Sequence, residues 1–231
     1  MEIITKVDDP TNWISSLVVA TKRNGKVRLC IDPKPLNNAL KRNHYTLPTI
    51  EDVLPLLFNA KFFTVLDARD GFRHVQLDSG SSYLTTFSTS CGRYRWLCMP
   101  LGITSAPEEF QRRMDTTLEC LDGTKAITDD ILVFGTAYTQ EEAEKSHDER
   151  LTAVLERCRQ KGVRLNKDKT QFKEQKVAYM GQVITSDGLQ ADPNKIKAIL
   201  NMPIPTDKEA VQRLLGMFND LLQDWLMLSN H

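Results

Sequence analysis

Residues 104–121 carry apolar side chains at the spacing of an amphipathic α-helix. Ser105 and Glu108 stand where a capping box would start this helix, and Pro107 is tolerated in its first turn. One apolar stripe follows, made of Phe110, Met114, Leu118 and Leu121. The segment therefore predicts a helix with one face in the core.

A second long helix is predicted over residues 139–162. Thr139 and Glu142 form its capping box, and Gly162 ends it. Its apolar face consists of Leu151, Val154, Leu155 and Cys158. The four histidines of the chain have no evident role, and we expect His147 on the surface of this helix.

Shorter segments predict strands and three further helices. Residues 16–32 predict a hairpin with its turn at Asn24-Gly25. Residues 62–72 predict a strand that runs into a turn, residues 73–78 and 83–89 are strand-like, and residues 177–189 predict a second hairpin. Helices are predicted at 47–60, 191–202 and 205–218, the first with a Thr49–Asp52 capping box and a kink at Pro55. This mixture of antiparallel hairpins and helices indicates the α+β class.

The composition is typical of a globular chain: the 231 residues are 41% hydrophobic and 26% charged, with a formal net charge of zero. Basic islands such as residues 21–28 do not by themselves indicate a partner. Five cysteines without C-x-x-C spacing argue against a disulfide framework or a structural zinc site and favour a reducing compartment. No signal peptide is evident and no apolar run approaches ~20 residues, so we expect no membrane association.

Two adjacent carboxylates, Asp129 and Asp130, interrupt the strand-like run KAITDDILVF, and Asp67 ends another apolar strand. If these strands are neighbours in one sheet, the three carboxylates meet at one edge. Burying unpaired carboxylates is costly, and such a cluster suits two hard cations that could support phosphoryl transfer. The alternative is a solvated hairpin tip, although no Gly, Asn or Pro is present to make an ordinary turn.

Six stretches in order, within residues 2–218, make the chain resemble the reverse transcriptase segment of gypsy-type LTR-retrotransposon pol polyproteins. They are VVATKRNGKVRLCIDPKPLN (fingers hairpin), FFTVLDARDGFRHVQL (motif A), GRYRWLCMPLGITSAPEEFQ (motif B), DDILVFG (motif C), HDERLTAVLERCRQKGVRLNKDKTQF (motif D) and VAYMGQVITSDG (primer-grip hairpin). The resemblance implies a right-hand polymerase with an antiparallel sheet and packed helices. Fingers and palm would cover residues 1–184, with the fingers interleaved at roughly 1–60 and 78–100, and a partial helical thumb would begin at 185–231.

The resemblance also implies the chemistry. Asp67, Asp129 and Asp130 fall on the catalytic metal ligands, and the backbone carbonyl of Ala68 falls on an additional ligand. The implied cofactor is a pair of Mg²⁺ ions, with Mn²⁺ as a substitute. The implied enzyme is an RNA-directed DNA polymerase, a nucleotidyltransferase that extends a primer on an RNA or DNA template with deoxynucleoside triphosphates.

Further positions resemble the family's nucleotide-binding residues: Lys22, Arg28, Asp70, Gly71, Phe72, Gly102 and Lys169. The two basic residues of the fingers hairpin would neutralise the triphosphate, and the Phe72 ring would exclude a ribose 2′-hydroxyl. Gly102 would admit close approach of the backbone to the template–nucleotide pair, and Lys169 would give a proton to the leaving pyrophosphate. The alternatives are an exposed basic hairpin, a core aromatic at position 72 and a solvated lysine at position 169.

The sequence departs from the family pattern in four places. Ile127 stands where the family has Tyr or Phe, and the segment 135–147 is longer than usual. The chain begins with the fingers already under way, and residues 220–231 do not continue the thumb or lead to a ribonuclease H or integrase region. We therefore expect weakened activity and keep two rivals, a retroelement relic that binds nucleic acid with little polymerisation and a metal-dependent phosphodiesterase. We expect a cytoplasmic location, with the nucleus and retroelement particles as alternatives, and the remaining pol segments as partners.

Overall fold

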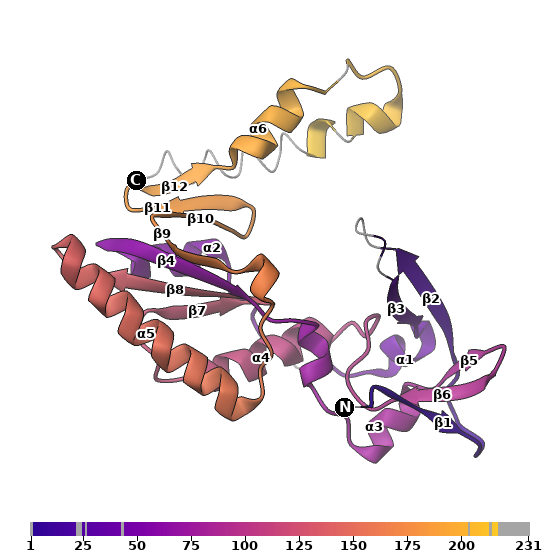
Figure 1. Ribbon diagram of the computed structural model, residues 1–231. Coiled ribbons are helices and arrows are strands. Elements are labelled where there is room, and N and C mark those ends of the chain that lie inside the picture. Colours follow the sequence, from indigo (N-terminus) through magenta and orange to yellow (C-terminus); the bar gives the residue numbers. More distant parts are fainter. Residues whose placement is uncertain are drawn as a thin grey trace.

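The computed structural model describes residues 2–21, 25, 27–42, 44–202, 204–212 and 214–216. Lys22 and Asn24 lie outside the described residues, whereas Gly25, the second residue of the expected turn pair, has a φ of +75°. Figure 1 shows two separate sheets with their helices, and a smaller sheet from which the C-terminal helices extend. The predicted α+β class is confirmed. No helix among the described residues is long and apolar enough to cross a membrane.

The first sheet contains five strands in the order β1-β6-β5-β2-β3. Its strands are β1 (Ile4–Val7), β2 (Ser15–Thr21), β3 (Val27–Asp32), β5 (Phe87–Thr89) and β6 (Gly92–Trp96). The antiparallel pairing of β2 with β3 confirms the predicted hairpin. Two short helices accompany this sheet, α1 (Lys34–Ala39) and α3 (Ser79–Leu84).

The second sheet has the order β7-β8-β4-β9 and carries the carboxylates. Its strands are β4 (Ala60–Asp67), β7 (Thr124–Ile127), β8 (Asp130–Thr136) and β9 (Gln171–Glu174). Both faces of β8 are buried, because Ile131 and Val133 pack into one apolar cluster while Leu132 and Phe134 pack into another. This explains why the sequence of β8 is a continuous apolar run.

The predicted long helices are α4 (Ala106–Leu118) and α5 (Gln140–Lys161), which contact each other and the second sheet. The expected stripe of α4 is confirmed, whereas Leu155 of α5 is 44% exposed and does not belong to the apolar face. Ser105 makes no side-chain capping bond, since its backbone is already helical. Glu108 instead pairs with Arg42, so this capping-box prediction is wrong.

The predicted helix over residues 47–60 is divided at Pro55. Its capping box is confirmed, with Thr49 N donating to Asp52 Oδ2 at 2.8 Å. The α-helical part, α2 (Ile50–Val53), continues directly as the 3₁₀-helix η1 (Leu54–Leu57). Because proline removes a helical hydrogen bond, it limits α2 to a single turn.

The strand-like predictions for residues 73–78 and 83–89 are wrong in part. The 3₁₀-helix η2 (Gly71–His74) covers the start of the first segment and α3 covers the start of the second, whereas β5 confirms the end of the second. Asp78 caps α3 by accepting from Ser81 N at 3.0 Å. This cap, and the run of small polar residues after it, favour a helical turn over a strand.

The third sheet, of order β10-β11-β12, contains β10 (Lys176–Tyr179), β11 (Gln182–Thr185) and β12 (Gly188–Ala191). It includes the predicted hairpin over residues 177–189. The helix α6 (Pro193–Leu200) follows, and residues 208–212 and 214–216 are helical, as predicted. The division of the chain into 1–184 and 185–231 stays a prediction.

Candidate active site

Asp67 and Asp130 lie opposite each other at the ends of the paired strands β4 and β8. Asp129 precedes β8, and its carbonyl accepts from Ala68 N at 2.6 Å. The three aspartates therefore meet at one end of adjacent strands, as the sequence suggested. Asp129 occupies a two-residue turn with Thr128, whose φ of +52° is unusual for a β-branched residue.

Gln111 of α4 holds this turn, and the sequence analysis missed it. Its side chain is fully buried. Oε1 accepts from Thr128 N at 2.7 Å, while Nε2 donates to Ala126 O at 2.9 Å. Its burial could have been predicted from the sequence, because Gln111 lies three residues before Met114 and thus on the apolar face of the helix.

The electrostatics of the turn disfavour ionised carboxylates. Desolvation, followed by the charges of Asp67 and Asp130, raises the pKa of Asp129 to about 6. Desolvation and the Asp67 charge also raise the pKa of Asp130. Oδ1 of Asp129 is buried and has no hydrogen-bond partner among the described residues. A buried, unpaired carboxylate oxygen beside two other carboxylates fits the needs of a hard cation.

Asp67 is already engaged. Lys169, in the 3₁₀-helix η3 (Lys167–Lys169), donates to its Oδ2 at 2.6 Å, and Asn166 Nδ2 donates to its Oδ1 at 3.2 Å. This contact raises the pKa of Lys169. Within the described part of the chain, no three acidic, His or Cys side chains already lie together as a metal-binding set. The cluster would have to release Lys169 to present a full set of oxygens.

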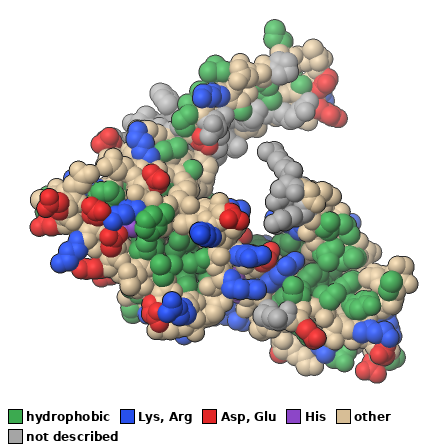
Figure 2. All heavy atoms as spheres, in the orientation of Figure 1, with side chains coloured by type: hydrophobic (Ala, Val, Ile, Leu, Met, Phe, Trp, Pro, Cys, Tyr) green, Lys and Arg blue, Asp and Glu red, His purple; other side chains and the backbone are tan. Residues whose placement is uncertain are grey.

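A cavity of about 240 Å³ opens next to the aspartates, between the two sheets. Arg28 of β3, Arg73 of η2 and Lys169 line it together with Asp67 and Asp129. Figure 2 shows Lys and Arg side chains gathered where the two parts of the molecule meet. The cavity thus combines carboxylates on one wall with cationic side chains suited to phosphate.

The motif A turn forms another wall of the cavity. Asp70 has a left-handed φ of +54° and lies 3.6 Å from Arg73 in an ion pair. A Cβ at Gly71 would overlap Asp129 Oδ1, so the missing side chain makes room for that carboxyl. Phe72 is half-buried and packs edge-to-face on Phe110, with ring centroids 5.7 Å apart at 70°. Its ring also lines the cavity.

Gly102 does not line this cavity. It has a φ of +114°, and a Cβ there would overlap the carbonyl of Ile31. Ile31 N donates to Leu101 O at 2.9 Å, which draws this segment against β3. The close packing of this backbone against β3 therefore requires a glycine at position 102, independently of any contact with a nucleotide. Lys22 lies outside the described residues.

Ile127, the departure from the family pattern, is buried at the end of β7. It packs in one apolar cluster with Tyr179 of β10. The Tyr179 hydroxyl donates to Asp130 O at 3.3 Å. The hairpin that resembles the primer grip is therefore anchored directly to the aspartate turn.

The expectation for His147 is wrong, since its side chain is fully buried. Its Nε2 lies 2.8 Å from Thr64 Oγ1, and its Nδ1 lies 3.1 Å from Asp148 Oδ1. Gly135 of β8 makes space for it, because a Cβ at position 135 would lie 2.5 Å from His147 Cβ. His147 thus ties α5 to the strand that ends in Asp67.

Comparisons with known proteins identify similar sequences and a similar fold. A family model described as "Reverse transcriptase (RNA-dependent DNA polymerase)" matches residues 20–184. The retrovirus-related Pol polyprotein from transposon 412 of Drosophila melanogaster is 35% identical over 224 residues, which is 93% of this chain and 18% of that protein. The Pol polyprotein from transposon opus is 35% identical over 96% of this chain and 22% of that protein. The chain thus spans about a fifth of these curated relatives.

Solved structures share the fold. The foamy viral protease–reverse transcriptase with double-stranded DNA matches with a TM-score of 0.82 and 21% identity, over 94% of this chain and 37% of that chain. The same viral protein with an RNA/DNA hybrid matches with a TM-score of 0.79 and 20% identity, over 94% of this chain and 28% of that chain. With the family match over residues 20–184, the chain belongs to the reverse transcriptase family and is related to gypsy-type retrotransposon Pol polyproteins.

Proposed function

We propose that the chain supplies the fingers and palm, with the start of a thumb, of a reverse transcriptase that adds deoxynucleotides to a primer 3′-hydroxyl. The observation that carries the proposal is the pairing of Asp67 with Asp130 beside a buried, unpaired oxygen of Asp129. Three carboxylates at one strand end have little structural use without a cation. The foamy viral relatives, solved with double-stranded DNA and with an RNA/DNA hybrid, support a template–primer duplex as the partner.

Asp67, Asp129 and Asp130, with the carbonyl of Ala68, would hold two Mg²⁺ or Mn²⁺ ions. When bound, such a pair activates the primer hydroxyl and neutralises the triphosphate in phosphoryl transfer. The residues fit this group, since Asp129 Oδ1 lacks a partner among the described residues, and desolvation together with the charges of Asp67 and Asp130 raises the pKa of Asp129. Asp67 joins the set when it exchanges its contact with Lys169 for the ions.

The other residues of the cavity would bind and orient the nucleotide. Arg28 and Lys22 neutralise phosphate charge from the fingers hairpin. The Phe72 ring, which packs on Phe110 and lines the cavity, would exclude a ribose 2′-oxygen. Lys169, an ammonium group at neutral pH that would be free once Asp67 turns to the ions, is suited to give a proton to the leaving pyrophosphate.

The Pol relatives extend well beyond the matched region, so the partners in the whole protein are a further part of the proposal. We propose that the chain acts together with the ribonuclease H and integrase segments of a pol polyprotein. All five cysteines are free thiols, which supports a reducing compartment such as the cytoplasm.

Primer extension on an RNA template with Mg²⁺ tests the proposal. Wild type should add deoxynucleotides, and Asp129→Asn should abolish addition while the chain stays folded. Glu119→Gln, an exposed carboxylate just after α4, is the matched control and should extend primers like wild type. If a folded wild type binds duplex but extends no primer with either ion or template, the chain is a binding relic. Cleavage of nucleic acid in place of extension would indicate a phosphodiesterase.

A further inference from the structure

A chain of hydrogen bonds crosses α4 and ends at the aspartate turn. The Tyr45 hydroxyl donates to Asp115 Oδ2 at 2.6 Å. Gln111 Nε2 donates to Asp115 Oδ1 at 3.0 Å, and Gln111 Oε1 accepts from Thr128 N at 2.7 Å. The path thus joins the segment that leaves the fingers to the residue next to Asp129.

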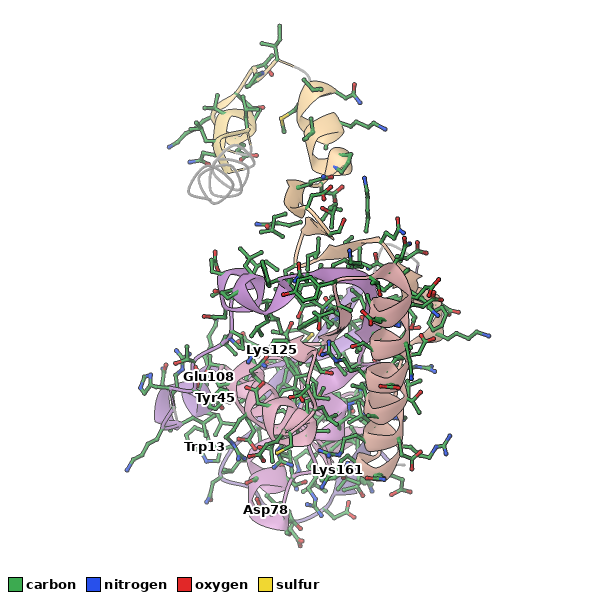
Figure 3. All side chains as sticks on the ribbon, turned by 90° about the vertical axis from the view of Figure 1, so that its left-hand side faces the viewer. Trp13, Tyr45, Asp78, Glu108, Lys125 and Lys161 are labelled. Carbon is green, nitrogen blue, oxygen red and sulfur yellow. The ribbon has the colours of Figure 1, made fainter. Side chains whose placement is uncertain are left out.

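Figure 3 shows Tyr45 beside Glu108 and Lys125 on the flank of α4 that faces away from α5. Arg42, on the same segment as Tyr45, pairs with Glu108 in the first turn of α4. Two contacts therefore hold the segment against this helix, one near its start and one near its C-terminal half. The position of the Tyr45 side chain is therefore fixed by a hydrogen bond from its hydroxyl to Asp115.

The orientation of the Gln111 amide determines whether it can hydrogen-bond to the turn. Thr128 N–H can only donate, so the amide must present its oxygen there. Ala126 O and the Asp115 carboxylate can only accept, so the amide must present its nitrogen to them. A reversed amide would set oxygen against two acceptors and N–H against N–H. Because Gln111 is fully buried, no water can relieve that mismatch.

Asp115 is itself fixed by Tyr45. Its two oxygens accept from different donors, one from Tyr45 and the other from Gln111, one turn earlier on α4. The pKa of Tyr45 is raised chiefly by its bond to Asp115, so the hydroxyl stays a donor at neutral pH. The carboxylate is half-buried and held between two donors, which limits its rotation.

We propose that Asp115, held by Tyr45, is a positioning residue for the catalytic turn. It fixes the amide of Gln111, which holds Thr128 at its positive φ and directs Asp129 toward Asp67. A role in catalysis rests on the proposed polymerase function, whereas the hydrogen bonds that hold the turn do not depend on it. Asp115 touches neither substrate nor metal in this assignment and acts only through Gln111.

Amide hydrogen exchange of Thr128, measured by NMR in metal-free protein without substrate, tests the positioning directly. In Asp115→Leu, Thr128 should exchange at least about tenfold faster, while Leu132 in the core of β8 keeps its wild-type rate. Asp115→Asn should restore most of the protection, because its carbonyl can accept from Gln111 and its amide can donate to Tyr45. Glu119→Leu, one turn further along, is the control and should change neither rate.

Kinetics supply the second measurement. Asp115→Leu should lower kcat about tenfold with KM for the nucleotide within about twofold, which is the pattern of a lost transition-state contact. Tyr45→Phe, which removes one hydroxyl and threatens the fold less, should speed Thr128 exchange about threefold.

The outcomes are distinct. Unchanged Thr128 exchange in both variants overturns the proposal, and so does an equal rise at Thr128 and Leu132, which would mean general destabilisation. If Thr128 exchanges faster in the variants but wild type extends no primer, Asp115 still positions the turn. The proposed polymerase function would then be wrong.

Discussion

Lys169 donates a hydrogen bond to Asp67 at 2.6 Å although 102 positions separate the two residues. The lysine therefore occupies one oxygen of the proposed metal site, and its charge moderates the repulsion among the aspartates. The charge of Lys169 also partly offsets the rise in the pKa of Asp129 that desolvation and the other aspartates cause. The same side chain thus stabilises the cluster without metal, and in the proposed metal site it would compete with the cation for Asp67.

Lys169→Met should therefore tighten Mn²⁺ binding, because one nearby positive charge and one competing donor are removed. A gain of at least about threefold is expected from the loss of ~1 kcal/mol of repulsion. Primer extension should nevertheless slow, since the proton donor is gone. Electron paramagnetic resonance titration of Mn²⁺ measures the binding. Lys173→Met, a lysine paired with Glu144 and Asp148 instead, should leave it unchanged. Equal Mn²⁺ affinity in all three proteins would show that Lys169 does not compete.

Asp129→Asn should make the metal-free protein more stable at pH 7.5. The folded-state pKa of Asp129 is about 6, above its ordinary value of 3.8. Between these values the unfolded chain gives up its proton first, so wild type loses stability as pH rises from about 4 to about 6. Above that range the penalty is constant, on the order of 2–3 kcal/mol.

Thermal unfolding at pH 4.5 and 7.5 checks this sign. The asparagine variant should melt several degrees above wild type at pH 7.5 and close to it at pH 4.5. Mg²⁺ should narrow the gap at pH 7.5, because it binds and stabilises native wild type. A variant that melts below wild type at pH 7.5 without metal would mean that Asp129 is a structural turn residue.

Gly71→Ala should damage activity far more than stability. The added Cβ would overlap Asp129 Oδ1 and lie 2.9 Å from Phe110 Cζ. The carboxyl is the softer neighbour, so it should rotate out of its place, with kcat falling at least about tenfold. Gly216→Ala, where the Cβ meets nothing within 4 Å, serves as the control. Unfolding of Gly71→Ala, or activity equal to wild type, would contradict this account of the glycine.

Apolar periodicity was sufficient to predict α4, α5 and the strands that bring the aspartates together, because burial repeats regularly along each element. The Asp67–Asp130 pairing followed from one apolar strand that ends in an aspartate and another that begins with one. Periodicity also contained a missed signal, since His147 lies four residues before Leu151 and thus on the buried face of α5. The polar residues next to His147 in the sequence made this turn of the helix look exposed. The space that Gly135 leaves for the imidazole depends on the fold and could not be read from the sequence.

Contacts between distant side chains could not be predicted. Gln111 meets Thr128, and Lys169 meets Asp67, only because helix and strand ends are brought together by the fold. Likewise, α3 depends on a local cap at Asp78 that competes with a weak strand pattern. Such contacts depend on tertiary geometry or on a single hydrogen bond, and neither produces a repeating pattern along the sequence.

Phe72→Val should relax sugar selection. The Phe72 ring lines the cavity and is braced edge-to-face by Phe110, so it presents a fixed wall beside Asp129. Shrinking it should raise the efficiency with ribonucleotides relative to deoxynucleotides at least about tenfold, a change of ~1.4 kcal/mol in relative transition-state free energy. Single-nucleotide extension with each substrate gives the two kcat/KM values. Phe172→Val, at a 60% exposed ring of β9, is the matched control and should leave their ratio unchanged. An unchanged ratio in an active Phe72→Val enzyme would make Phe72 a packing residue for Phe110 and place the sugar elsewhere in the cavity.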